Sequence, residues 1–334
     1  MSGGRVAIMD RRSHRRSYSD LRHLIQRSLE GCSGFGSRIE LDGKLDRMAE
    51  GLWHENYWFR VRARPDAYIL RLLDESEDWQ QGPEPRDRLI REAETLQVLE
   101  KCDFGHPTPN FICFVRYDES EPIGMIETGL PGYSLYGHED RSTLRLVSRV
   151  AANVHRLTAQ EFPHLPSSSR TEHVKSQLAE FEEDLYVEFP LAREVRDWIA
   201  AQVPADDHSC VLHGDLLPQN LLCDWPTAGV EDPPVGVVDW EMARIGDPAY
   251  DLAIVSRGNR KVCGVKDGLK ILVEEYLESG GQPVSLTEVR VHELILILRW
   301  LEEAWHEYQK PVTRGHGPDF YEDKLQSLFR RAAG

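Results

Sequence analysis

A short polar motif between apolar segments places the strongest constraint on this chain. In His213-Gly-Asp-Leu-Leu-Pro-Gln-Asn220, four residues separate Asp215 from Asn220. Asp239 follows nineteen residues after Asn220, where the apolar run 235–238 ends. Because that run has the composition of a buried strand, it predicts a rigid backbone that presents the Asp239 carboxylate at its end. Carboxylate and amide oxygens are the ligands that Mg²⁺ prefers, so the three residues predict a metal-assisted site.

The order and spacing of these residues suit phosphoryl transfer. In kinase catalytic loops an Asp precedes an Asn by five positions; the Asp positions the acceptor hydroxyl and the Asn holds Mg²⁺. Asp215 is therefore the predicted catalytic residue, and Asn220 and Asp239 are the predicted metal ligands. Any one of them alone could be ordinary turn chemistry, since Asp and Asn favour turns. The combination, with apolar strands between its members, favours catalysis.

At these residues the chain resembles the aminoglycoside phosphotransferase and choline kinase-like family of small-molecule kinases. The family patterns H-G-D-x-x-x-x-N and G-D-P-x-x-D-L-A match segments 213–220 and 246–253, and residues 239–241 match the D-[FW]-[ED] part of the pattern I-D-[FW]-[ED]. The resemblance implies an α+β, bilobal, protein kinase-like fold: a small N-lobe with an antiparallel sheet and one key helix, and a larger, mainly helical C-lobe. Leu217, where many relatives carry His, and the long loop 225–234 depart from the pattern, but neither affects the base or metal positions.

The resemblance and the distribution of turn residues divide the chain into four segments. They are a flexible basic tail with an N-terminal helix (1–37), a nucleotide-binding N-lobe (38–128), a hinge (129–132) and a helical C-lobe with the catalytic loop and substrate site (133–334). Short apolar runs predict strands at 39–41, 57–62, 67–73, 111–117 and 124–128. Helical periodicity predicts helices at 19–30, 85–101, 143–157, 172–189, 191–201, 249–256, 266–278, 285–308 and 319–332.

A buried ion pair is expected in the N-lobe. Arg71 interrupts an apolar strand, and the resemblance implies that this cation grips the α- and β-phosphates of the nucleotide. Glu92 lies on the apolar face of the helix predicted at 85–101, whereas Glu94 is rotated about 200° from it and should face solvent. An acid on an apolar face needs a buried partner, so Glu92 is predicted to pair with Arg71.

Two further N-lobe segments are implied to contact the nucleotide. Gly51 is the glycine that remains of the loop covering the nucleotide in the resembled family, so backbone cradling of the phosphates would be weak. Backbone groups around Glu127 and Gly129 would bind the adenine edge, with a plain interdomain linker as the alternative. ATP is the expected donor, GTP the alternative, and Mg²⁺ the expected metal.

Two stretches of the C-lobe are candidates for the acceptor site. Glu180 and Glu183 belong to an acidic run that would attract ammonium groups, although charge runs are usually solvated surfaces. Trp300, Glu303 and Glu307 share one helical face and would bind a cation through charge and aromatic contact. A core helix with a solvated rim explains the same residues. The resemblance implies that the Asp that begins the segment Asp251-Leu-Ala braces the catalytic loop. The histidine at 155 is expected to be a core or rim residue rather than a ligand.

Composition narrows the functional classes. A net charge of −16 argues against nucleic acid as a partner, because phosphate backbones need a basic surface. The six cysteines include no C-x-x-C pair, so a zinc site is not expected. Neither a leader peptide nor a membrane-spanning run is evident, which favours a cytoplasmic location without membrane association.

The sequence therefore predicts an ATP- and Mg²⁺-dependent kinase that phosphorylates a hydroxyl of a small molecule. An amino sugar, an amino alcohol or another cationic metabolite or antibiotic would serve as acceptor. A nucleotide-binding regulatory module without turnover is the alternative. The absence of a D-F-G triplet disfavours a protein kinase. A monomer or a homodimer is expected.

Overall fold

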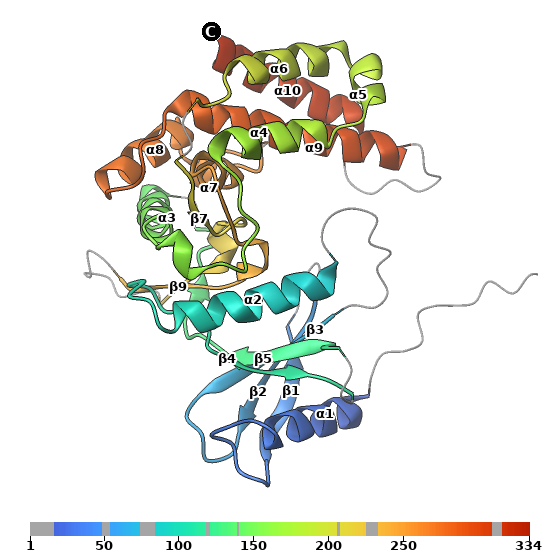
Figure 1. Cartoon of the computed structure of the whole chain (residues 1–334), viewed down its shortest axis with the longest axis vertical. Helices are drawn as coiled ribbons and strands as arrows, with labels where there is room; N and C mark the ends of the chain where they lie inside the picture. Colours follow the sequence, from blue (N-terminus) through green and yellow to red (C-terminus); the bar gives the residue numbers. More distant parts are fainter. Residues whose placement is uncertain are drawn as a thin grey trace, which may run out of the picture. The chain divides into compact units, whose positions relative to one another are not determined.

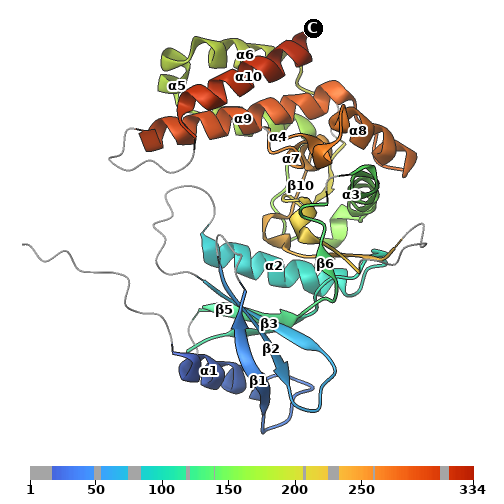
Figure 2. The same ribbon diagram turned by 180° about the vertical axis from the view of Figure 1, so that it is seen from behind.

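The computed structural model describes residues 17–48, 54–73, 84–117, 121–138, 140–205, 208–224, 233–258, 260–308 and 316–334. The chain forms two compact units (Figures 1 and 2). The sheet unit contains the described residues up to Ala93, together with those of Pro109–Leu130. The helical unit contains Glu94–Thr108 and the described residues from Pro131 onward.

The sheet unit is built on one antiparallel sheet with the strand order β1-β2-β3-β5-β4. One helix, α1 (Tyr18–Glu30), packs against β1 and β4, and α2 (Pro85–Leu99) begins in this unit (Figure 2). This arrangement confirms the five strands expected for the small lobe. The strands are β1 (Leu41–Arg47), β2 (His54–Val61), β3 (Ala67–Leu73), β4 (Phe111–Val115) and β5 (Gly124–Thr128).

The first strand differs from its prediction. The apolar run at 39–41 suggested a short strand, but β1 starts at Leu41 and continues to Arg47 through mostly polar residues. Only Leu41 and Leu45 are buried along it, and the pairing register with β2 shifts between Asp42 and Asp46. A bulged edge strand of this kind lacks the regular alternation of polar and apolar residues that reveals a strand in sequence.

Helix α1 has the boundaries that its sequence predicts. The side-chain oxygen of Ser17 accepts from the backbone N–H of Asp20, whose carboxylate in turn accepts from the N–H of Ser17, which forms a capping box. The helix ends before Gly31. Its apolar face is buried with the sheet in one core, which secures the N-terminal helix to this unit. The buried residues of that face are Leu21, Leu24, Ile25 and Leu29.

The helical unit contains most of the helices and two small antiparallel sheets with the orders β6-β8-β9 and β10-β7. Its helices are α3 (Arg141–Val154), α4 (Arg170–Ala179), α5 (Glu183–Glu188), α6 (Pro190–Ala201), α7 (Ala249–Ile254), α8 (Gly268–Glu278), α9 (Leu286–Tyr308) and α10 (Pro318–Ala333). Its strands are β6 (Tyr133–Ser134), β7 (Cys210–Leu212), β8 (Leu221–Cys223), β9 (Val235–Val237) and β10 (Arg244–Gly246). Short 3₁₀ turns are η1 (Ala159–Glu161), η2 (Pro218–Asn220), η3 (Trp240–Met242) and η4 (Val262–Gly264).

The long apolar helix α9 organises this unit. It packs against α10, α7, α4 and α6, and its buried side chains form one core with those of α4, α5, α6 and α10 (Figure 1). Helix α3 packs against α8 and α7. The apolar face of α3 is buried, as its helical periodicity predicts, so α3 is a second helix that contributes to the core of this unit.

The prediction of one continuous helix at 172–189 is wrong. This segment forms two helices, α4 and α5, because the chain is extended at Glu182. The backbone N–H of Glu182 donates to the carboxylate of Glu302 at 2.8 Å, and Phe181 is buried between the helices. This tertiary hydrogen bond satisfies an amide that a continuous helix would have used internally, so local periodicity could not reveal the break.

The boundaries of the two units also differ from the segments predicted from the sequence. The sequence placed 38–128 in one lobe, whereas residues 94–108, including the end of α2, belong to the helical unit. The backbone N–H of Val237 donates to the carbonyl oxygen of Pro107 at 2.9 Å, and the Phe104 ring packs edge-on against Trp240. These contacts fix the loop after α2 to the unit that carries the catalytic loop.

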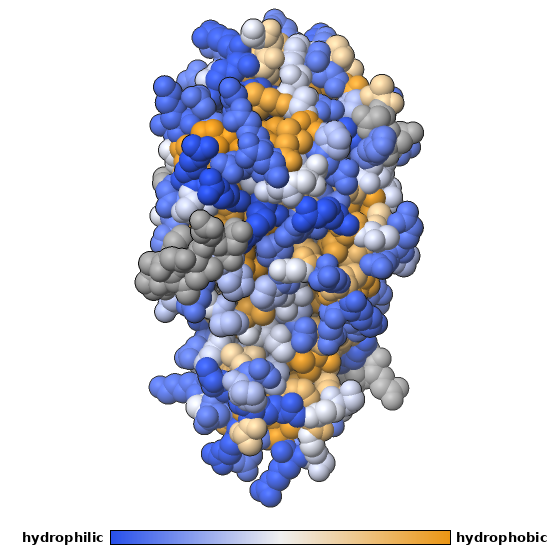
Figure 3. Space-filling model, turned by 90° about the vertical axis from the view of Figure 1, so that its left-hand side faces the viewer, coloured by the Kyte–Doolittle hydropathy of each residue, from blue (hydrophilic) through white to orange (hydrophobic). Residues whose placement is uncertain are grey.

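Hydrophilic side chains cover much of the face shown in Figure 3, and apolar patches lie between them. The bilobal α+β architecture, with a smaller sheet-containing part and a larger helical part, agrees with the fold expected from the sequence. Among the described helices, none has both the length and the apolar composition needed to cross a lipid bilayer.

Candidate active site

The catalytic loop places the predicted base and one predicted metal ligand in direct contact. Strand β7 ends immediately before His213, and the loop returns to β8 through the 3₁₀ turn that ends at Asn220. The side-chain amide nitrogen of Asn220 donates to Asp215 twice, to Oδ2 at 2.9 Å and to the backbone carbonyl oxygen at 2.8 Å. Since both partners are acceptors, the amide oxygen of Asn220 is the atom left to ligate a cation.

Strand pairing brings Asp239 to the same place. Strands β8 and β9 are antiparallel, with Leu221 opposite Val237. The backbone N–H of Val238 donates to the carbonyl oxygen of Asn220 at 3.0 Å. Asp239 therefore follows β9 beside the residue that precedes β8. The three polar residues predicted from the motif lie together in the helical unit.

Asp239 adopts a left-handed backbone conformation, with φ 71° and ψ 59°. For a residue other than glycine this conformation is uncommon, and it persists where the surroundings impose it. The next residue, Trp240, is fully buried and its indole N–H donates to the carbonyl oxygen of Val237 at 3.3 Å. Burial of Trp240 thus holds the turn that directs the Asp239 carboxylate.

The electrostatics of this cluster favour a bound cation. Burial, and after it the negative charge of Asp239, raise the pKa of Asp215 to about 6, against the opposing effects of Arg257 and the Asn220 hydrogen bond. Two carboxylates and an amide oxygen at one place are the donor set of a hard divalent cation, which would relieve the repulsion between the carboxylates. The residues present therefore fit Mg²⁺.

Asp251, at the start of α7, braces the catalytic loop as expected. Its carboxylate accepts from the backbone N–H of His213 at 2.7 Å and from that of Gly214 at 2.9 Å. The same carboxylate contacts Nε2 of His155 at 3.2 Å, and the other ring nitrogen of His155 lies 2.8 Å from the hydroxyl of Tyr276. His155 is fully buried, which confirms it as a core residue.

His213 links the catalytic loop to the end of β9, a role that the sequence did not reveal. Its Nδ1 accepts from the backbone N–H of Asp215 at 3.3 Å, and its Nε2 lies 3.0 Å from the carbonyl oxygen of Val238. This pattern assigns the neutral tautomer with the proton on Nε2. Burial, moreover, lowers the pKa of His213. The imidazole therefore bridges, through its two ring nitrogens, the segments that carry Asp215 and Asp239.

Gly214→Ala is expected to destabilise the helical unit strongly. Gly214 has φ 82°, and an added Cβ would lie 2.1 Å from the carbonyl oxygen of Met242, a contact that only a backbone shift can relieve. Such overpacking typically costs about 1–3 kcal/mol beyond the penalty for a left-handed alanine. The free energy of unfolding, measured by chemical denaturation, tests this expectation.

Gly137→Ala is the matched control, because Gly137 has φ 83° and open space around its Cβ position. It carries the same conformational penalty without the clash. Equal losses of stability in the two variants would show that the Met242 contact plays no part.

In the sheet unit, Arg71 and Glu92 form the predicted ion pair. Nη1 of Arg71 donates to Oε1 of Glu92 at 2.7 Å, and the two side chains are only 7% and 1% exposed. Nη2 of Arg71 lies 3.4 Å from Nδ1 of His54, a neighbour on β2. Glu94 is exposed, as its helical rotation predicts. Gly51 lies outside the described residues.

Glu127 and Gly129 lie at the end of β5. The backbone N–H of Thr128 donates to the carbonyl oxygen of Asn110 at 3.0 Å, and that of Gly129 donates to Ala67 at 2.8 Å. Both N–H groups are thus engaged within the sheet unit. The adenine contact expected for this segment stays a prediction and would have to use other backbone groups.

The residues predicted to form an acidic acceptor site have protein partners. Glu180 accepts from Nη2 of Arg299 at 2.7 Å, and Glu183 lies 3.7 Å from Nη1 of Arg196. Both glutamates are largely exposed, as expected of a solvated surface.

On α9, Trp300 is half-buried and stacks against Tyr321 of α10, with ring centroids 6.5 Å apart. The negative charges of Glu303 and Glu307 act on the same tyrosine and contribute to raising its pKa, after burial. Helix α10 therefore covers part of this face. A role in substrate binding stays a prediction for these residues.

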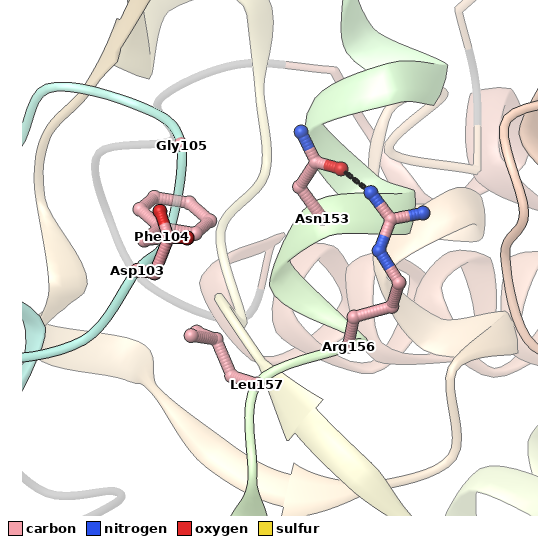
Figure 4. A pocket seen from close by; sticks show the side chains of 6 residues that line it. All are labelled: Asp103, Phe104, Gly105, Asn153, Arg156 and Leu157. Atoms are coloured by element: carbon pink, nitrogen blue, oxygen red, sulfur yellow. Dashed lines mark hydrogen bonds between the residues drawn. The ribbon is translucent and has the colours of Figure 1, made fainter.

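A separate cavity of about 250 Å³ lies in the helical unit (Figure 4). It is lined by Asp103, Phe104, Gly105, Asn153, Arg156 and Leu157. Arg156 donates to the amide oxygen of Asn153, and Phe104 is the residue that packs against Trp240. None of the predicted site residues lines this cavity.

Comparison with known proteins places the chain in a family. A model of the phosphotransferase enzyme family matches residues 45–269. Viomycin phosphotransferase of Streptomyces vinaceus is 32% identical over 185 residues, which is 51% of this chain and 62% of that protein. Acyl-CoA dehydrogenase family member 11 of Gallus gallus is 27% identical over 264 residues, or 74% of this chain and 32% of that protein. The chain thus spans less than two thirds of either relative.

Solved structures share the fold. The macrolide 2'-phosphotransferase type I structure superimposes with a TM-score of 0.62 at 16% identity, over 95% of this chain and 96% of that one. A thermostable mutant of aminoglycoside phosphotransferase APH(4)-Ia, in a ternary complex with AMP-PNP and hygromycin B, gives 0.61 at 14% identity, over 93% and 99%. The protein kinase-like fold expected from the motifs is confirmed. With the family model spanning the catalytic loop and both predicted metal ligands, the chain belongs to the phosphotransferase enzyme family.

Proposed function

We propose that this protein transfers the γ-phosphoryl group of ATP, in a Mg²⁺-dependent reaction, to a hydroxyl group of a small molecule. The observation that carries the proposal is the cluster of Asp215, Asn220 and Asp239, in which the Asn220 amide is hydrogen-bonded to the Asp215 carboxylate at 2.9 Å. The AMP-PNP complex of a structural neighbour supports ATP as the donor, with GTP as the alternative. The likeness to viomycin phosphotransferase supports a small-molecule acceptor.

Each residue has a distinct role in this proposal. Asp215 orients the acceptor hydroxyl and accepts its proton as the phosphoryl group is transferred. The amide oxygen of Asn220 and the carboxylate of Asp239 hold Mg²⁺, which neutralises charge on the phosphates when bound. Arg71, fixed by Glu92, contacts the α- and β-phosphates through its guanidinium fork.

A regulatory module without turnover is the second candidate. Such a module has no need for a base, whereas Asp215 is supported by Asn220 and its loop by two hydrogen bonds to Asp251. Asp239 also retains a strained backbone, which costs about 1–3 kcal/mol and is typical of active sites. These features favour catalysis. A cytoplasmic location, where ATP and Mg²⁺ are available, belongs to the same proposal.

The test is a coupled ADP-release assay over amino sugars, amino alcohols, nucleosides and plain sugars, with a Mg²⁺ titration for each active acceptor. Asp239→Asn is expected to raise the Mg²⁺ concentration for half-maximal activity by at least about 10-fold, because it removes a charged ligand. Asn tolerates the left-handed conformation of this position, so the backbone is preserved.

Asp267→Asn is the matched control, since Asp267 is an exposed residue that also has a left-handed backbone, with φ 56°. Wild-type Mg²⁺ dependence in Asp239→Asn would contradict the metal role. Nucleotide binding without ADP release under any condition would favour the regulatory module.

A further inference from the structure

Arg257 is a half-buried cation that the roles above do not use. It follows α7, the helix whose Asp251 holds the catalytic loop. Within the described part of the chain, its guanidinium forms no hydrogen bond and no ion pair. Withdrawing a charge from water without a partner is unfavourable, so a cation in this state is typical of a site completed by a ligand.

The charge of Arg257 acts on the predicted base. It interacts electrostatically with Asp215, with Arg260 and with the phenol of Tyr136, all in the helical unit. Arg260 is exposed and likewise has no ion-pair partner among the described residues, and Tyr136 is 63% exposed. Two neighbouring arginines that form no ion pair in the described structure are unexpected in a chain of net charge −16, and together they attract anions.

The backbone holds Arg257 in place. Its φ is 47°, a left-handed conformation, and its N–H donates to the carbonyl oxygen of Ile254 at 2.8 Å. The following Gly258 has φ 70° and packs so closely on α9 that a Cβ would lie 3.0 Å from the carbonyl oxygen of Glu293. A strained arginine followed by a tightly packed glycine is a fixed feature of the turn, and strain of this kind is retained where it serves a site.

The positive charge of Arg257 acts on Asp215 against the negative charge of Asp239, and its sign is opposite to that of the acidic acceptor site expected from the sequence. Of the acidic residues predicted to attract a cationic acceptor, Glu180 is paired with Arg299 and Glu183 lies near Arg196. By contrast, the guanidinium of Arg257 interacts electrostatically with Asp215 and forms no hydrogen bond or ion pair in the described structure.

We propose that Arg257, assisted by Arg260 and Tyr136, binds an anionic group of the acceptor, a carboxylate or a phosphate, beside Asp215. The inference rests on the proposed function, because it takes Asp215 as the base that receives the acceptor hydroxyl. A guanidinium binds two oxygens of such a group at once, and the phenol supplies a further donor. The acceptor class is therefore a hydroxy acid or a phosphorylated alcohol rather than a simple amine.

The γ-phosphoryl group of the nucleotide is the other anion that Arg257 would meet, and the experiment separates the two sources. Acceptor-stimulated ADP release is measured with compounds of matched size and different charge. One set is gluconate, sorbitol and glucamine, a second is glycolate, ethylene glycol and ethanolamine, and a third is glycerol phosphate with glycerol. The readout is kcat/KM for the anionic member of a set divided by that for the neutral member.

The wild-type protein is expected to prefer the anionic member of at least one set by about 10-fold or more. Arg257→Gln is expected to reduce this ratio by about 10- to 100-fold, the effect of losing charge-assisted hydrogen bonds. Arg257→Lys keeps the charge but loses the fork, so it should recover part of the ratio. Arg193→Gln, which removes an exposed arginine on α6, should leave the ratio unchanged.

Preference for the cationic members, or an unchanged ratio in Arg257→Gln, overturns the proposal. An equal fall in kcat/KM for all members of a set overturns the proposal as well, and it assigns Arg257 to the transferred phosphoryl group. So does the absence of stimulation in all three sets while the protein still releases ADP by an Asp215-dependent reaction with water. Absence of any Asp215-dependent ADP release is a different result, because it removes the proposed function itself.

Discussion

Asp215→Ala is expected to lower kcat by about 10²–10⁴, the usual contribution of a positioned general base, while nucleotide binding persists. Asp215 is the carboxylate to which the Asn220 amide donates at 2.9 Å, and its loop is held by His213 and Asp251. Removing the carboxylate leaves the acceptor hydroxyl without a group that orients it and takes its proton. The loss should appear in kcat rather than in the Kd for nucleotide, measured by fluorescence titration.

Asp215→Asn is the companion variant. It keeps the side-chain volume and one hydrogen-bonding oxygen near Asn220, but it cannot accept a proton at neutral pH. If positioning alone mattered, Asp215→Asn would retain most of the activity that Asp215→Ala loses. Unchanged turnover in both variants would contradict the assignment of Asp215 as the base.

Asp251→Asn is expected to cost about 3–5 kcal/mol of folding free energy, the loss typical of breaking a buried ionic contact. The Asp251 carboxylate is fully buried and accepts from the N–H groups of His213 and Gly214 and from His155. An amide has one acceptor oxygen, so its NH₂ group would face donors that then lack a partner. Because those donors hold the catalytic loop, turnover should fall together with stability.

The same residue predicts the acid sensitivity of the fold. Burial raises the pKa of Asp251, but the hydrogen bond and charge of His155, with further contributions from His213 and Gly214, outweigh it and leave the pKa below its ordinary value of 3.8. The stabilisation is therefore complete above about pH 4 and is lost as the pH falls through the lower pKa of the folded state. Asp251→Asn should lack this part of the acid transition in denaturation curves.

Asp184→Asn, at an exposed position of α5, makes the same chemical change without burial and should leave the free energy of unfolding and its pH dependence unchanged. If Asp251→Asn lowers the free energy of unfolding no more than this control does, the catalytic loop does not depend on Asp251.

Where the sequence signal was local and periodic, the prediction succeeded. The boundaries of α1 and β3 and the Arg71–Glu92 pair follow from spacing, capping and the need of a buried acid for a partner. The break between α4 and α5 did not, because it depends on a hydrogen bond from Glu182 to Glu302, 120 residues further along the chain. The role of His213 was missed for the same reason, since its partner Val238 follows another strand, β9.

The sequence by itself determined the family and the fold class, and it predicted the residues of the phosphoryl-transfer motif, because these depend on residue type at fixed short spacing. The tertiary structure alone decided how Asp251 and His213 hold the catalytic loop, and which charges surround the base. Charge near a site is set by residues distant in sequence, as the electrostatic effect of Arg257 on Asp215 illustrates. For that reason a pattern of acidic residues suggested a cationic acceptor, whereas in the folded chain the charge of an arginine also acts on the predicted base.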